Sequence, residues 1–115
     1  MTVNEKIMRA LKPLGIPVVA DFSGGGEKEY ITFNYASDEA ALSGDDGPME
    51  VVASMQIHYF LPMDRDYLSI KKRIRKALFS AGFTYPSVEH LTEPEGNIRH
   101  LIFECEIEND DELEC

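Results

Sequence analysis

The chain of 115 residues has no apolar run that approaches the ~20 residues of a membrane-spanning helix. Its opening stretch, Met1 to Lys6, lacks the basic and apolar regions of a secretory signal peptide. Cysteine is scarce, and a disulfide between Cys105 and Cys115 would have to fold an acidic segment back onto a strand. We therefore expect a cytoplasmic protein with free thiols and no membrane contact.

Motifs of catalysis and ligand binding are also missing. The glycines at 24–26 precede a strand, whereas a phosphate-binding loop needs Gly-Lys-Ser/Thr at the start of a helix. No Gly-x-Ser-x-Gly elbow occurs. His58, His90 and His100 have no cysteine or carboxylate at zinc-binding spacing, although two of them could still meet across neighbouring strands. The sequence predicts no enzyme activity, no cofactor and no metal site.

Length and composition favour one folded domain. The apolar fraction of 43% and the charged fraction of 28% are typical of globular chains. We expect a single domain over residues 1–108 and a disordered acidic tail over 109–115. The net charge of −10 argues against duplex DNA or anionic lipid as the principal ligand, since both are polyanions.

Apolar periodicity predicts two helices and up to five strands. The first helix is expected over residues 3–12, with Thr2 or Asn4 as its N-cap, and the second from an N-cap at Asp64 to a stop at Gly82. The expected strands are 16–22, 29–37, 49–61, a weaker 83–91, and a last one around 100–107. This order is typical of an α+β domain with a mostly antiparallel four- to five-stranded sheet and two helices packed on one face.

The clearest strand is 49–61, where every odd position is apolar. We predict that these odd positions face the core together with two further sets of residues. One set is Ile70, Ile74 and Leu78 of the second helix, and the other is Leu101, Phe103, Cys105 and Ile107 of the last strand.

An acidic segment over residues 36–48 separates two of the expected strands. It contains Asp38, Glu39, Asp45 and Asp46 and no basic residue. The segment is longer than a tight hairpin needs, which predicts a mobile loop. We expect it to become ordered against a partner, or to line a channel, when the protein assembles.

Charge is divided between elements of the chain. Six of the eleven Lys and Arg residues lie between Arg65 and Lys76, while residues 77–115 contain ten acids and a single base, Arg99. The candidate interface between subunits or partners combines a basic helix face with an acidic strand face: Lys72, Arg73, Arg75 and Lys76, and Glu104, Glu106 and Glu108. A solvated helix face is the simpler alternative, and nucleic-acid binding is disfavoured because no aromatic side chains are interleaved with the cations.

Three segments together resemble the tail-completion, or tail-terminator, proteins of long-tailed bacteriophages and prophages. They are Leu11 to Val18 with Tyr30 to Phe33, the helix from Asp66 to Phe83, and Glu93 to Phe103. The resemblance implies a structural α+β subunit that forms a ring, commonly a hexamer, which caps the tail tube and joins it to the head. The implied partners are copies of itself, the tail-tube protein and head–tail connector proteins, with no sequence-specific nucleic acid. The implied locations are the bacterial host cytoplasm during assembly and then the virion tail or neck.

The acidic C-terminal extension departs from the family pattern, which leaves the tail-facing and head-facing surfaces unassigned. Two other classes stay open. An acidic inhibitor that mimics DNA, or another small phage protein-binding module, would suit the net charge of −10 but would not need a basic helix. A small phage enzyme has no motif to support it.

Overall fold

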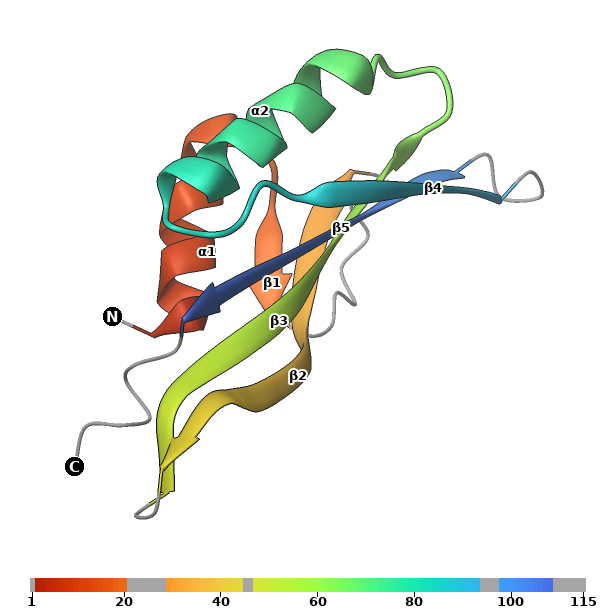
Figure 1. Cartoon of the computed structure of the whole chain (residues 1–115). Coiled ribbons are helices and arrows are strands. Elements are labelled where there is room, and N and C mark those ends of the chain that lie inside the picture. Colours follow the sequence, from red (N-terminus) through yellow and green to blue (C-terminus); the bar gives the residue numbers. More distant parts are fainter. Residues whose placement is uncertain (1, 21–28, 45–46, 94–97, 109–115) are drawn as a thin grey trace.

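Two helices cover one face of a five-stranded sheet in the computed structural model, which describes residues 2–20, 29–44, 47–93 and 98–108 (Figure 1). The elements are α1 (Val3–Leu11), the 3₁₀ turn η1 (Lys12–Leu14), β1 (Val18–Ala20), β2 (Tyr30–Gly44), β3 (Gly47–Pro62), α2 (Leu68–Ser80), β4 (Ser87–Glu93) and β5 (Ile98–Glu108). The strand order is β1-β2-β3-β5-β4, and every neighbouring pair is antiparallel except β1 and β2. The expected fold class is confirmed.

Local sequence signals explain where α1 begins and ends. The Thr2 hydroxyl accepts a hydrogen bond from the Glu5 backbone N–H at 3.1 Å, which satisfies one of the free donors of the first turn. Val3, Ile7 and Leu11 are buried along one stripe of the helix. After η1, Gly15 adopts a positive φ of 74°, a conformation that suits glycine and ends the helical segment.

The second helix starts later than its sequence suggested. Asp64 lies in a turn in which the Arg65 N–H donates to the Pro62 carbonyl at 3.2 Å, so the prediction of Asp64 as the N-cap was wrong. The carboxylate of Asp66 instead accepts a hydrogen bond from the Leu68 N–H at 3.1 Å. At the other end, Gly82 takes a positive φ of 108° just beyond the last turn, as expected of a helix stop.

The core lies between the sheet and the two helices. On β3, Ala53, Met55, Ile57, Tyr59 and Leu61 are all buried, which confirms the predicted alternation over the part of the strand where side chains are described. The side chains of Met49 and Val51 fall outside that part. On the neighbouring strand β5, the predicted residues Leu101, Phe103, Cys105 and Ile107 are also buried. Ile74 and Leu78 of α2 are buried in the same core, while Ile70 is partly buried and packs at its margin.

Both edge strands are short, and proline is placed where it does not interrupt pairing. Pro17 precedes β1, and its carbonyl accepts a hydrogen bond from the Ile31 N–H at 2.8 Å. Pro86 is buried just before β4, so that strand starts at Ser87 instead of near residue 83. Residues 21–22, at the end of the first expected strand, lie outside the described residues.

The acidic segment 36–48 is not the loop that its composition suggested. β2 continues through Gly44 and β3 begins at Gly47, and the two strands stay paired from Tyr30↔Phe60 to Gly44↔Gly47. Register shifts occur between Tyr35 and Ser37, between Ala40 and Leu42, and between Leu42 and Ser43. Like β-bulges, they interrupt the regular pairing without ending it, so this polar stretch remains in the ladder. Asp38 and Glu39 therefore belong to a strand, whereas Asp45, Asp46 and the tail 109–115 lie outside the described residues.

The distal part of this hairpin, residues 40–44 and 47–51, is here named the arm. β5 pairs with β3 only as far as Val52↔Glu108, and β1 pairs with β2 only at residues 31–33. Within the described ranges, each strand of the arm therefore pairs only with the other. Five residues at about 3.4 Å each make the arm roughly 17 Å long. It points away from both helices (Figure 1), in a molecule that measures 53 × 26 × 25 Å.

None of the helices in the described part of the chain is both long and apolar enough to span a bilayer.

Candidate interaction surfaces

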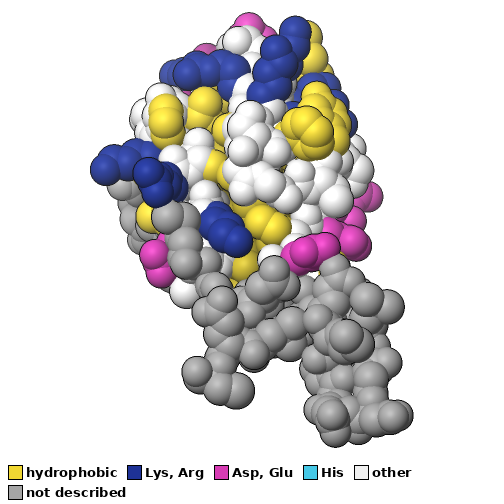
Figure 2. All heavy atoms as spheres, turned by 60° about the vertical axis from the view of Figure 1, so that its left-hand side comes forward, with side chains coloured by type: hydrophobic (Ala, Val, Ile, Leu, Met, Phe, Trp, Pro, Cys, Tyr) yellow, Lys and Arg dark blue, Asp and Glu magenta, His cyan; other side chains and the backbone are white. Residues whose placement is uncertain are grey.

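The two layers of the fold differ sharply in charge. The helix layer, residues 3–14 and 68–80, contains eight of the eleven Lys and Arg residues and a single acid, Glu5. The five strands together contain eight acids and a single base, Arg99. Figure 2 shows Lys and Arg side chains at several places around the side of α1 and α2, with hydrophobic side chains between them. The molecule is therefore strongly polarised from one layer to the other.

The predicted basic set on α2 divides into exposed and engaged residues. Lys72, Arg73 and Lys76 are exposed on the outer side of the helix. Arg75 is half-buried: its Nε donates to the Pro86 carbonyl at 3.0 Å, and its guanidinium lies 5.4 Å from the centre of the Tyr85 ring. Arg75 thus ties α2 to the segment before β4, and three of the four predicted cations are presented to solvent.

The predicted acidic set lies on the other side of the sheet. Glu104, Glu106 and Glu108 are exposed and alternate along β5 with residues that point into the core. The face they occupy is the one that the helices leave open. Glu106 accepts a hydrogen bond from the Ser54 hydroxyl at 3.4 Å, and its backbone pairs with Thr84. The basic and acidic sets therefore occupy opposite layers of the fold.

A chain of hydrogen bonds joins three strands on the same open face. His58 Nε2 lies 3.0 Å from Asn34 Oδ1, and His58 Nδ1 lies 2.9 Å from His100 Nε2. An amide oxygen only accepts, so His58 is assigned its proton on Nε2 and accepts at Nδ1 from the His100 Nε2–H. Two of the three histidines thus meet across neighbouring strands, as the sequence left open. His90 lies on the helix side of the sheet, edge-on to Tyr67 at 5.6 Å between ring centres.

Aromatic rings extend this cluster into a band across the sheet. The ring centres of Tyr30 and Phe60 are 4.8 Å apart, and those of Phe60 and His100 are 4.1 Å apart. All of these side chains are half-buried, and Leu91 on β4, paired with His100, is 42% exposed. Sequence reasoning missed this band because alternation places each residue on a face but does not give the register between strands.

The histidine pair predicts a pH dependence of stability. Burial lowers the pKa of His58 below its ordinary value of 6.5. The unfolded chain then binds more protons than the folded one, so this contribution is present above about pH 6.5 and is lost as the pH falls below it. A second proton would also place two N–H groups against each other at the His58–His100 contact. By register, the other titratable groups of this face whose side chains are described are Tyr30, Glu89, Glu104, Glu106 and Glu108.

We expect the urea midpoint of the wild type to fall more than that of His58→Gln between about pH 7.5 and about pH 5.5. Glutamine keeps a donor and an acceptor but does not titrate. The variant therefore controls for the pH dependence that the many carboxylates give to both proteins. Equal shifts in the two proteins would show that the His58 pKa does not govern this range.

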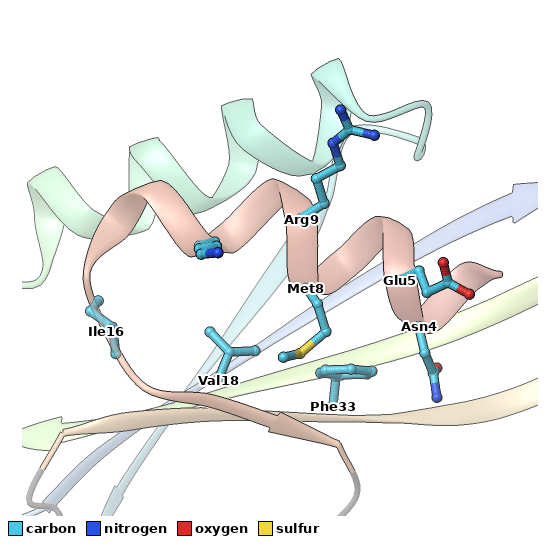
Figure 3. Close-up of a pocket in the computed structure, with 8 residues that line it drawn as sticks. Asn4, Glu5, Met8, Arg9, Ile16, Val18 and Phe33 are labelled. Atoms are coloured by element: carbon cyan, nitrogen blue, oxygen red, sulfur yellow. The ribbon is translucent and has the colours of Figure 1, made fainter. Parts of the chain in front are cut away.

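An apolar groove of about 730 Å³ lies between α1 and the β1 edge of the sheet (Figure 3). Met8 reaches down from α1 toward Val18 and Phe33, while Arg9 points away from the sheet. Phe33 is buried at the base, whereas Met8 is 41% exposed. The remaining lining residues are polar or lie near the groove ends: Asn4, Glu5, Lys12 and Ile16. The groove therefore presents accessible apolar surface beneath a rim that contains two cations.

Metal-ligand side chains do not gather in threes anywhere in the described ranges. Comparison with known protein families finds no family model that matches the chain. A search of the curated proteins likewise finds no match. The interpretation of these surfaces therefore depends on their own geometry and on the resemblance described above.

Proposed function

We propose that this chain is a structural subunit of a bacteriophage or prophage tail, of the tail-completion type, with no catalytic role. In this proposal it forms a homo-oligomeric ring, six-membered in the commonest case, that caps the tail tube and meets the head–tail connector. It would act in the bacterial host cytoplasm during assembly and then in the virion tail or neck. The observation that carries the proposal is the arm, because it gives the subunit a feature that assembly would explain.

An isolated two-stranded hairpin is at best marginally stable in water. Within the described ranges, the arm extends beyond the three-strand part of the sheet, so both of its outer edges expose backbone donors and acceptors. A monomer would gain little from ordering such a segment. A subunit that covers the arm with a neighbour would gain both hydrogen bonds and buried surface.

The charge distribution also supports a ring through which DNA passes. With a net charge of −10, the subunit as a whole repels a polyanion, so DNA would not bind tightly to the assembled ring. The basic helix layer argues against the alternative of a DNA mimic, which would present acids and not cations to its target.

Native mass spectrometry of the purified chain, alone and with the tail-tube protein of the same gene cluster, tests the proposal. We expect one defined ring stoichiometry, and negative-stain images of tubes that end in a cap. A matched variant deletes the arm by joining Glu39 to Val52 through Asn-Gly, since these two residues are paired in register and Asn-Gly suits a tight hairpin. The variant should fold with a urea midpoint near that of the wild type and remain monomeric.

A chain that stays monomeric at every concentration, with and without the tube protein, would contradict the proposed function. Rings that form equally well from the armless variant would remove the arm as its supporting observation.

A further inference from the structure

The arm and the groove between α1 and β1 are both surfaces that the described residues of a single copy leave uncovered. The arm points away from both helices, so it cannot reach the groove of its own chain (Figure 1). The groove, about 730 Å³ in volume, has apolar side chains at its base and opens to solvent. A second copy is the simplest source of an occupant, because one contact between two identical chains would cover both surfaces.

The position of the groove favours an occupant in extended conformation. β1 is the edge strand of the sheet, and its described residues pair on one side only, with β2. A strand placed beside β1 would add to the sheet through backbone hydrogen bonds and would direct alternate side chains under α1. The arm consists of strands, and its sequence has small or apolar residues at Ala40, Leu42, Met49 and Val51.

Charge complementarity also favours the arm as that occupant. Residues 40–51 contain three acids, Asp45, Asp46 and Glu50, and no base. The groove is bordered by the helix layer, which contains eight bases and a single acid. Arg9 and Lys12 are among the residues that line it. Opposite charges attract two approaching copies and favour one relative orientation, while the buried apolar area supplies most of the affinity.

We propose that the arm of one copy docks in the α1–β1 groove of the next copy. This inference rests on the proposed ring and names the surfaces that join its subunits. The contact is heterologous, since arm and groove are different surfaces, so it repeats from copy to copy and closes when the rotation between subunits allows.

Disulfide cross-linking tests the contact directly. The background is Cys115→Ser, which leaves Cys105, whose thiol is buried with a pKa raised to about 12 and is therefore unreactive at neutral pH. Chains with Ser43→Cys in the arm are mixed with chains with Met8→Cys in the groove, assembled and oxidised. We expect covalent dimers from most of the mixed chains. The control replaces Met8→Cys by Glu89→Cys, at an exposed position on the open face of the sheet, and should give only background dimer.

Charge reversal gives an independent readout. Arg9→Glu with Lys12→Glu should raise the concentration needed for half-assembly by about tenfold or more, and Glu50→Lys in the arm should restore part of the loss. Backbone amides of residues 40–44 and 47–51 should become protected from hydrogen exchange on assembly.

The outcomes separate this inference from the proposed function. Rings with the arm–groove cross-link and arm protection support both. Rings that form without the cross-link, and that tolerate the reversal at Arg9 and Lys12, would overturn the docking site and leave the ring standing. The absence of rings would overturn both.

Discussion

Ile57→Ala and Phe103→Ala are expected to lower the free energy of unfolding by about 2–5 and 3–5 kcal/mol, respectively. Both side chains are fully buried, and the two residues are directly paired on β3 and β5 at the centre of the sheet. Truncation would leave a cavity between the sheet and the helices, and the packed neighbours can collapse into it only in part. Urea denaturation at constant pH measures the loss.

The matched control for this prediction is Ile102→Ala. Ile102 is adjacent to Phe103 on the same strand but is half-buried on the open face. The same removal of three carbons should therefore cost only about 1 kcal/mol. If Ile57→Ala unfolded at the wild-type midpoint while Ile102→Ala was strongly destabilised, the two faces of the sheet would be assigned backwards.

Lys72→Glu with Lys76→Glu is expected to weaken ring formation at least tenfold without changing the stability of the isolated subunit. The exposed cations of α2 and the acids Glu104 and Glu106 of β5 lie on opposite layers of one copy, so a second copy offers the natural place for them to meet. Exposed ion pairs contribute at most ~1 kcal/mol each, but a double reversal replaces two attractions by two repulsions. Native mass spectrometry across a concentration series measures the effect.

Glu104→Lys with Glu106→Lys, added to the same chain, should restore part of the lost assembly. Raising the salt concentration should shrink both effects, because exposed charges are screened. Rings that form equally well in the first double variant, at low and at high salt, would remove the α2 face from the interface.

Elements with strong periodicity could be predicted from the sequence. The alternation along 49–61 gave the correct core face of β3 from Ala53 to Leu61, where side chains are described, and the stripe through Ile74 and Leu78 gave that of α2. These signals are strong because burial of one face imposes a period on the sequence that no other requirement mimics.

Other features depend on contacts between segments that are distant in sequence. The continuation of β2 through Asp38 and Glu39 was missed because acidic residues and three register shifts hide the alternation, while the partner strand holds the backbone in the ladder. The meeting of His58 with His100 depends on the register of β3 against β5, which local sequence does not encode. The number of charged residues in each expected helix and strand could be counted from the sequence. That the basic and acidic sets lie on opposite layers could be seen only once the arrangement of the elements was known.

The strand order determines how late in its synthesis the chain can complete its fold. β5 is the last described strand in the chain, yet it lies between β3 and β4 in the sheet and contributes Leu101, Phe103, Cys105 and Ile107 to the core. A nascent chain that lacks this strand has no partner for the inner edge of β4 and a large opening in its core. The ribosome must therefore release β5 before this sheet can be completed, because the last contacts are long-range. Translation products that end before β5 would lack a complete core.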